Sequence, residues 1–539
     1  MFASLYLFSH SPYFQGWATA FGSAALVALV LTPFIWQCAK VYSLGSISRI
    51  VPIAMIIVAV LIQVMHSVDP SGMSTHPDEA LHLSCYDYFL HAFWPPAASD
   101  PAIVPSLTSS VWGISYLNYY DVVYFLAAHT TQPFLSFLGA PLAGARTFQL
   151  FLWVSLAVFG IVRRHWGLAL IPLLLTPQVW YVFSYFNGDA LPLFLSIIAV
   201  ALVSDTGNSL DNFMLEGGLP RRATIIFCAC IGLLIVSKAN YLPVVFGIFL
   251  YIAIKYLDLK WIELILAIVG AVFLGVGAFL VKLPSDVLHQ EKLIFISLGA
   301  ISFLLFILTT SLRIFSKARA QVVFFRRAFV LVALALLFAS PRIVDDLVIN
   351  GLPAAKSATI LSMTEKYAQP AFRPSAISAG TSFEGLAFAQ KGISLSRMIW
   401  GQYNWIGTSI KSFFGTYGYM TIWAPGPFYL VLAGLFSTLL AWVSILTLRS
   451  PKGGKIVFLV FGCVALITIS SIFYSWIFGF QPQGRYLLPA IPLLSFIFVS
   501  MQRVEKEPLT KIFILIAFAL SVYSYASVGI PGIAAHHLQ

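Results

Sequence analysis

Long apolar runs separated by short polar segments recur along almost the whole chain of 539 residues. A helix needs roughly 20 apolar residues to cross a bilayer, and most of these runs approach that length. The pattern therefore predicts an all-α, polytopic membrane helix bundle with about 12–14 spans, forming a single integral membrane domain over 1–539. The candidate spans are 17–38, 50–66, 145–162, 167–184, 189–204, 223–238, 241–256, 261–281, 292–310, 328–342, 424–447, 456–477, 486–500 and 511–530.

Two stretches interrupt this pattern for longer than a tight turn requires, 67–144 and 343–423. Both mix aromatic and polar residues, for example Trp94 and Trp112 in the first and Trp400 in the second. This composition is typical of helices that lie in the headgroup region. We expect two long loops with interfacial helices, and 121–138 as an interfacial or re-entrant segment.

The few charges predict which side each loop faces. When the spans alternate and the loop with Lys40 and Arg49 is placed inside, 19 of the 31 Lys and Arg residues fall inside, against 7 of the 20 acids. Excess Lys and Arg mark cytoplasmic loops. Both long loops, both termini and 13 acids then lie outside.

Composition excludes two other classes of protein. With 59% hydrophobic and 9% charged residues, the chain cannot cover a water-exposed surface, and it is too apolar to be disordered. A net charge of +11 in a soluble protein would suggest nucleic-acid binding, but here the cytoplasmic loops account for it and no nucleic-acid partner is expected. The five scattered cysteines form neither a zinc pattern nor a disulfide framework.

The first candidate site is the segment Thr75-His76-Pro77-Asp78-Glu79-Ala80-Leu81-His82 in the first outer loop. It places two carboxylates and two imidazoles next to the membrane. The same residues are also typical of a helix start, with Thr75 or His76 as the cap and Pro77 in the first turn. A helix here would place Asp78 and His82 on one face. Because carboxylates and imidazoles are metal ligands, Asp78, Glu79 and His82 could hold a divalent ion, Mg²⁺ or Mn²⁺. The spacing is not that of a His-Glu-x-x-His zinc motif.

Two further motifs lie at predicted outer ends of spans. Asn187-Gly188-Asp189 joins two spans, where turn chemistry alone could explain it. Gln483-Gly484-Arg485-Tyr486-Leu487-Leu488-Pro489 opens a late span, and Arg485 either extends to the headgroups or holds an anion. Lys238 lies at another predicted outer hairpin, where it too could either extend to the headgroups or hold an anion.

Together the Pro77-Asp78-Glu79, Asn187-Gly188-Asp189 and Gln483-to-Pro489 motifs resemble those of bacterial polytopic membrane proteins with a Pro-Asp-Glu motif, which look like members of the GT-C glycosyltransferase superfamily. The resemblance covers about 50–500 in arrangement but rests on some twenty residues. This chain departs from the simplest GT-C layout by an additional predicted N-terminal span, and it lacks a large soluble C-terminal domain.

The resemblance implies a membrane glycosyltransferase of glycan biosynthesis in the cell envelope. It would sit in the bacterial inner membrane and act on the periplasmic or exterior face. The donor would be a sugar on polyprenyl phosphate, and the acceptor a hydroxyl of a glycan, lipid or protein.

The implied catalytic residues are Asp78, as general base in an inverting transfer, and Glu79 as its neighbour. Arg485 and Lys238 would bind the donor phosphate, and six residues would line the substrate site: His76, His82, Asn187, Asp189, Gln483 and Tyr486.

Other functions remain alternatives on sequence grounds. A transporter or flippase of lipid-linked glycans would place ionisable residues near the bilayer midplane, often in repeated halves. An O-antigen-type polymerase or a structural membrane protein could use the same outer loops.

Overall fold

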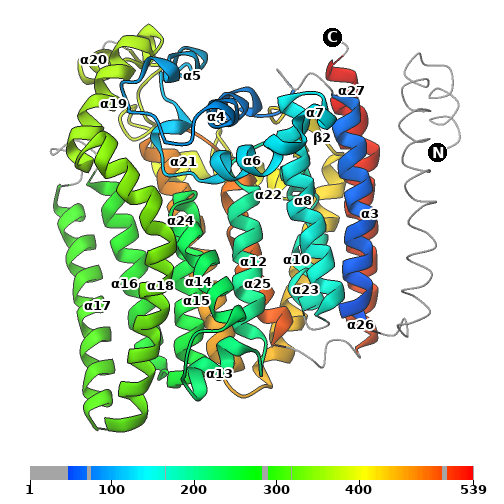
Figure 1. The fold of residues 1–539 in the computed structure, drawn as a ribbon, viewed down its shortest axis with the longest axis vertical. Coiled ribbons are helices and arrows are strands. Elements are labelled where there is room, and N and C mark those ends of the chain that lie inside the picture. The colour runs from blue at the N-terminus through cyan, green and yellow to red at the C-terminus, as the bar shows by residue number, and fades with distance from the viewer. Residues whose placement is uncertain are drawn as a thin grey trace, which may run out of the picture.

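The structure is a computed structural model that describes residues 46–69, 75–163, 166–281, 289–316, 318–380, 382–500 and 507–537. These residues form a helix bundle with one short hairpin, which confirms the all-α prediction (Figure 1). The predicted span 17–38 lies outside the described residues.

Nine helices of the described part are long and apolar enough to cross a membrane, or ten if the bent pair α12–α13 is one span. They identify an integral membrane protein. The helices of these spans are α3 (Ile47–Val68), α8 (Pro141–Val162), α15 (Leu242–Ile252), α16 (Trp261–Leu280), α17 (His289–Ser316), α18 (Ala318–Asn350), α23 (Gly426–Leu448), α24 (Gly453–Ile477) and α26 (Pro508–Val522). A 3-10 turn and a π-helical segment extend α15 to a span over Ala239–Leu257, and α26 continues through a π-helical segment into α27 (Ile530–His537).

Four predicted spans are shorter or interrupted in the structure. The segment 167–184 forms three short buried helices, because Pro172 and Pro177 each lack the N–H that continues a helix. Gly484 to Leu487 forms a 3-10 turn before α25, so the span 486–500 is also shortened. The short helices here are α9 (Trp166–Ala169), α10 (Ile171–Leu174), α11 (Pro177–Val182), α12 (Ala190–Ser204), α13 (Ser209–Leu215), α14 (Arg222–Ile235) and α25 (Ala490–Val499).

Both long loops lie at the same end of the bundle, which we call the loop end (Figure 1). The hairpin at the end of the second loop packs against α11, since Gly418 N donates to Tyr181 Oη at 2.9 Å. The loop elements are α4 (Glu79–His91), α5 (Val104–Ser109), α6 (Val123–Thr131), α7 (Leu135–Leu138), α19 (Pro353–Tyr367), α20 (Pro374–Ser378), α21 (Leu395–Ile399), α22 (Trp405–Phe413), β1 (Thr416–Tyr417) and β2 (Ile422–Trp423).

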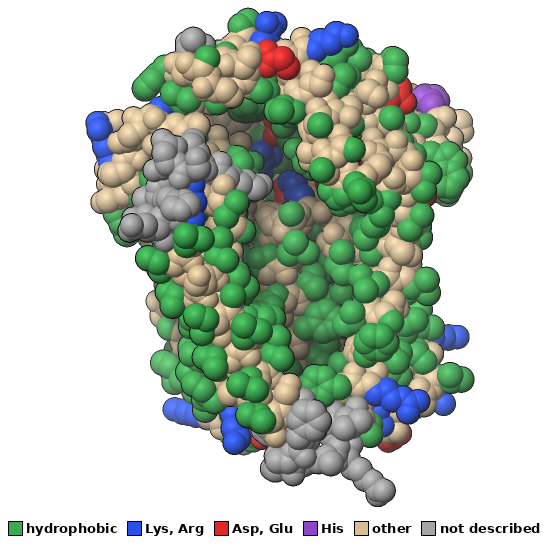
Figure 2. All heavy atoms as spheres, turned by 90° about the vertical axis from the view of Figure 1, so that its left-hand side faces the viewer, with side chains coloured by type: hydrophobic (Ala, Val, Ile, Leu, Met, Phe, Trp, Pro, Cys, Tyr) green, Lys and Arg blue, Asp and Glu red, His purple; other side chains and the backbone are tan. Residues whose placement is uncertain are grey.

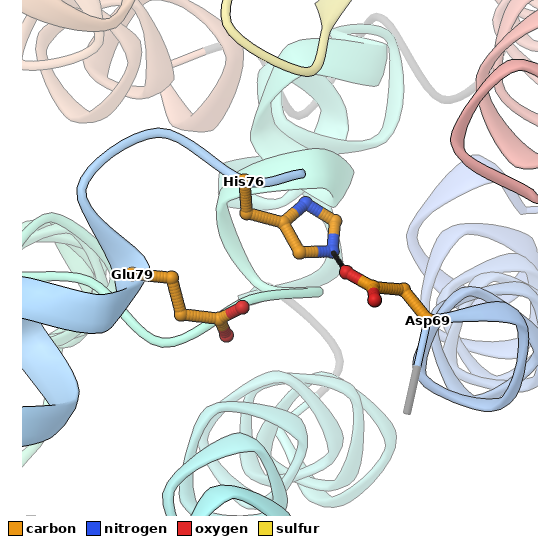
Figure 3. A group of neighbouring side chains, drawn as sticks. All are labelled: Asp69, His76 and Glu79. Atoms are coloured by element: carbon orange, nitrogen blue, oxygen red, sulfur yellow. Dashed lines mark ion pairs between the residues drawn. The ribbon is translucent and has the colours of Figure 1, made fainter. Parts of the chain in front are cut away.

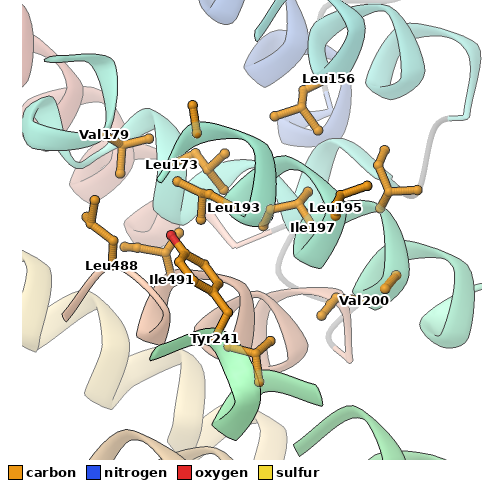
Figure 4. Packing of buried hydrophobic residues seen from close by; sticks show 14 of the residues in the cluster. Leu156, Leu173, Val179, Leu193, Leu195, Ile197, Val200, Tyr241, Leu488 and Ile491 are labelled. Atoms are coloured by element: carbon orange, nitrogen blue, oxygen red, sulfur yellow. The ribbon is translucent and has the colours of Figure 1, made fainter. Parts of the chain in front are cut away.

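The centre of the bundle is a continuous apolar core. Leu173, Leu193 and Ile491, from α10, α12 and α25, meet in it, and Tyr241 points its ring into the same cluster (Figure 4). The Tyr241 hydroxyl donates to the Asp189 carbonyl at 3.3 Å, at the top of that core. The core therefore supports the polar loop end directly.

On one side the bundle is hollowed. Helix α17 packs along α16 and α18 packs along α14, while α17 and α18 contact each other little. Figure 2 shows a groove on this side, with apolar walls and with basic and acidic side chains deep in its upper part. The groove thus connects the lipid-facing surface with the interior of the loop end.

Candidate functional site

The predicted Asp78 and Arg485, 407 residues apart in sequence, meet at the loop end. Arg485 Nη2 donates to Asp78 Oδ2 at 3.0 Å, and the Asp78 side chain remains 28% exposed. Asp78 adopts the left-handed conformation with φ 60°, which Asp tolerates better than most residues. Its backbone N–H donates to Tyr419 Oη at 3.2 Å. The hairpin and the last motif together hold the Asp78 turn.

The helix starts later than the sequence suggested. Helix α4 begins at Glu79, and Asp78 occupies the cap position in place of Thr75 or His76. The reason is the left-handed turn at Asp78, which reverses the chain just before the helix. As a result Asp78 and Glu79, although adjacent, face different surroundings.

Gly484 explains how Arg485 reaches the site. A β-carbon at 484 would lie 2.1 Å from Phe413 N, so only glycine lets this turn lie against the end of α22. Arg485 itself is buried, and its Nε has no hydrogen-bond partner. Its guanidinium lies 5.5 Å from the Tyr486 ring centre. One buried guanidinium N–H is thus left without an acceptor.

Charge keeps Asp78 ionised. Burial alone would raise the pKa of the Asp78 carboxyl, but the Arg485 cation, and after it that of Lys238, outweigh this effect, and the pKa lies below its ordinary value. The group is a carboxylate at physiological pH, and in this pairing it is a weak base.

Glu79 is sealed beneath the site. Arg146 Nε donates to Glu79 Oε1 at 2.9 Å and Nη2 to Oε2 at 2.6 Å, and Phe186 N donates to Oε1 at 2.7 Å. The side chain is buried and has no exposed surface for a substrate. Glu79, predicted as a catalytic neighbour of Asp78, is therefore placed as a structural partner of Arg146.

The ligand set predicted for a metal does not converge. Asp78 pairs with Arg485, Glu79 with Arg146, and His82 Nδ1 with the Tyr124 hydroxyl at 2.7 Å. A different trio, Asp69, His76 and Glu79, has its ligand atoms within 4.8 Å of one another (Figure 3).

The Arg146 guanidinium already lies against both carboxylates of this trio. It lies 2.6 Å from Glu79 Oε2 and 3.5 Å from Asp69 Oδ2, and Nη1 donates to the Asp69 carbonyl at 2.5 Å. His76 Nε2 lies 3.2 Å from Asp69 Oδ2, as the dashed line in Figure 3 marks, and Nδ1 lies 2.8 Å from Tyr181 Oη. Arg146 thus offsets one of the two carboxylate charges of the trio.

Both predicted histidines are buried and neutral. Burial, followed by the Lys238 charge, lowers the pKa of His82 to about 3, and burial with Arg146 lowers that of His76 well below its usual range. His82 stacks on Tyr116 with 4.4 Å between ring centres. These rings shape the floor and wall of the site and carry no charge.

The second motif adds a further ion pair. Asn187 Oδ1 accepts from Asp189 N at 2.8 Å, and its amide nitrogen donates to the Val182 and Tyr185 carbonyls, which closes the predicted turn. Asp189 Oδ2 accepts from Lys238 Nζ at 2.7 Å. Lys238 therefore reaches the loop end paired with a carboxylate.

The remaining predicted residues flank Arg485. Tyr486 Oη donates to Gln481 Oε1, and Tyr486 N donates to the Gln483 carbonyl at 3.1 Å. The side chains of Gln483 and Tyr486 are partly exposed, close to Arg485 in the sequence.

Sequence reasoning missed Arg146, Asp121 and Tyr419. Arg146 could have been found, because an arginine inside a predicted apolar span marks a polar partner. Asp121 and Tyr419 carry no such local signal, since their roles depend on distant segments.

No protein-family model and no curated protein matches this sequence.

Proposed function

We propose that this protein is a membrane glycosyltransferase that moves a sugar from a polyprenyl-phosphate donor to an acceptor hydroxyl at the loop end. The observation that carries the proposal is the partly exposed Asp78–Arg485 pair, which joins a base and a phosphate-binding cation from two distant motifs. By the charge pattern of the loops, the reaction occurs on the periplasmic or exterior face of a bacterial inner membrane.

The groove of Figure 2 supports a lipid-linked donor. Its apolar walls suit a prenyl chain entering from the bilayer, and charged side chains lie at its inner end. Lys238 and Arg485 would hold the phosphate.

The transfer needs one base and no general acid. The acceptor oxygen attacks the anomeric carbon, the bond from that carbon to the phosphate oxygen breaks, and the acceptor proton passes to Asp78. Polyprenyl phosphate leaves with the bonding electrons, and Arg485 and Lys238 stabilise its added charge. A single displacement of this kind inverts the anomeric centre.

Donor binding would also activate the base. In the unliganded site Arg485 lowers the pKa of Asp78 and weakens its basicity. A phosphate that takes over the Arg485 guanidinium would release Asp78 and raise its pKa. The ion pair would then hold the base inactive until the donor arrives.

The position of the acids favours an enzyme over a transporter or flippase. Within the nine candidate spans of the described residues, the acidic residues are Glu263, Asp345 and Asp346, all close to helix ends. A transporter of charged cargo would be expected to carry them near the midplane.

The test is transfer from a panel of radiolabelled polyprenyl-phosphate sugars by purified protein in lipid. Asp78→Asn should lower the rate by roughly 10²–10⁴-fold, the usual loss for a general base. Arg485→Ala should lower it by roughly 10²–10³-fold. The matched controls are Asp87→Asn and Arg397→Ala, whose side chains are exposed elsewhere in the loops. Rates close to wild type in both site variants would reject the proposal.

A further inference from the structure

Asp121 is a buried carboxyl group that the proposed reaction does not use. It is 8% exposed, and it lies just before α6 in the first long loop. Its Oδ1 accepts one long hydrogen bond, from Val123 N at 3.4 Å. Capping of α6 alone therefore does not account for an acid at this position.

The backbone brings Asp121 to the second motif. Val122 N donates to the Val236 carbonyl at 3.2 Å, which fastens the Asp121 segment to the end of α14, two residues before Lys238. A β-carbon at position 188 would lie 2.6 Å from Asp121 Oδ2 and 3.4 Å from Lys238 Cε, so these two atoms are within 6.0 Å of each other. A side chain at position 188 would meet the Asp121 carboxyl, so the glycine leaves that carboxyl its place.

We infer that Asp121 is a further functional residue of the site, a carboxyl group that shares the Lys238 ammonium with Asp189 and thereby sets how strongly Lys238 binds the donor phosphate. The inference rests on the proposed function for the identity of the anion. With Asp121 ionised, two carboxylates face one ammonium and an incoming phosphate is repelled. With Asp121 protonated, the three groups are neutral together and the phosphate meets no excess negative charge.

The surroundings make Asp121 the group that changes charge near neutrality. Burial raises the pKa of Asp121 to about 7, although Lys238 opposes this. Two further charged contacts lie near it. Arg342 Nη2 donates to the Tyr119 carbonyl, and Lys238 Nζ donates to Asp189 Oδ2.

The uncharged neighbours of Asp121 have pKa values far from the range between pH 6 and pH 8. On α4, His82 has a pKa of about 3, and burial raises that of the Cys85 thiol to about 12. On α6, burial raises the pKa of Tyr124 well above its usual range.

The experiment measures binding of farnesyl methyl phosphate to the full-length protein by calorimetry at pH 6 and pH 8. This diester carries one negative charge at both pH values, so the ligand does not titrate. With a pKa of about 7, the wild-type Kd should be about tenfold weaker at pH 8 than at pH 6. Asp121→Asn should bind equally at both pH values, as tightly as the wild type at pH 6, and the control Asp87→Asn should follow the wild type.

A second variant tests the geometry without removing the acid. Gly188→Ala would push the Asp121 carboxyl away from its place beside Lys238, and we expect the pH dependence to shrink to less than about threefold. Wild-type affinity that is equal at pH 6 and pH 8, or the tenfold change persisting in Asp121→Asn, would overturn the role of Asp121 and leave the proposed function standing. Absence of binding to the wild type at both pH values would overturn the proposed function, and this inference with it.

Discussion

Two ion pairs made by adjacent residues contrast sharply in this protein. The Asp78 carboxylate accepts one bond from Arg485 at 3.0 Å and stays partly exposed, whereas the buried Glu79 carboxylate accepts two bonds from Arg146 and one from Phe186 N. In the first pair a ligand can replace Asp78 as the partner of Arg485. In the second pair Arg146 cannot leave Glu79 without unfolding the residues around it. The comparison separates the carboxylate available for chemistry from the one that builds the scaffold.

The largest expected effect is on the sealed pair. Arg146→Met would leave the buried Glu79 carboxylate without its guanidinium, and breaking a buried pair in this way costs about 3–5 kcal/mol of folding free energy. Thermal unfolding in detergent, followed by the loss of monodisperse protein, should show a large fall in the midpoint. Arg397→Met, at an exposed arginine, is the control, and an equal midpoint in both variants would show that the pair is not structural.

The open pair should respond in the opposite way. Asp78→Asn removes the charge from a pair whose carboxylate is partly exposed, and the amide oxygen can still accept from Arg485, so we expect a smaller loss than the about 3–5 kcal/mol of a fully buried pair. We expect the unfolding midpoint to stay near that of the wild type while sugar transfer is lost. A loss of stability as large as that of Arg146→Met would contradict the distinction between the two carboxylates.

The smallest effect concerns the hairpin that supports the open pair. Tyr419→Phe removes the hydroxyl that accepts from Asp78 N, and one such bond contributes about 0.5–1.5 kcal/mol. The transfer rate should fall by roughly threefold to tenfold with little change in stability, because the Asp78 turn becomes less well fixed. Full activity in this variant would show that the hairpin does not position Asp78 for the reaction.

Hydropathy predicted most of the bundle, because lipid-facing helices must be apolar whatever their packing. It was less successful at 167–184 and 486–500, where prolines divide buried apolar segments into short helices. Apolar composition is the same for a buried short helix and for a span, so only tertiary structure separates them.

The sequence predicted some residues of the site and not the contacts that set their roles. Asp78 and Arg485 were assigned to one site, and the structure brings them into contact. Glu79 was placed with them because it is next in sequence, but the left-handed turn at Asp78 directs the two carboxylates apart. Arg146, which decides the role of Glu79, comes from α8 and leaves no trace in the Pro-Asp-Glu motif itself.

The most direct test of the central claim is an experimental structure of the protein with a non-hydrolysable polyprenyl-phosphate sugar analogue in lipid. We expect phosphate density within hydrogen-bond distance of Arg485 and the prenyl chain in the groove of Figure 2. Asp78 should have left Arg485 and turned toward the sugar. Phosphate bound elsewhere, with the Asp78–Arg485 pair still intact at about 3.0 Å, would contradict it.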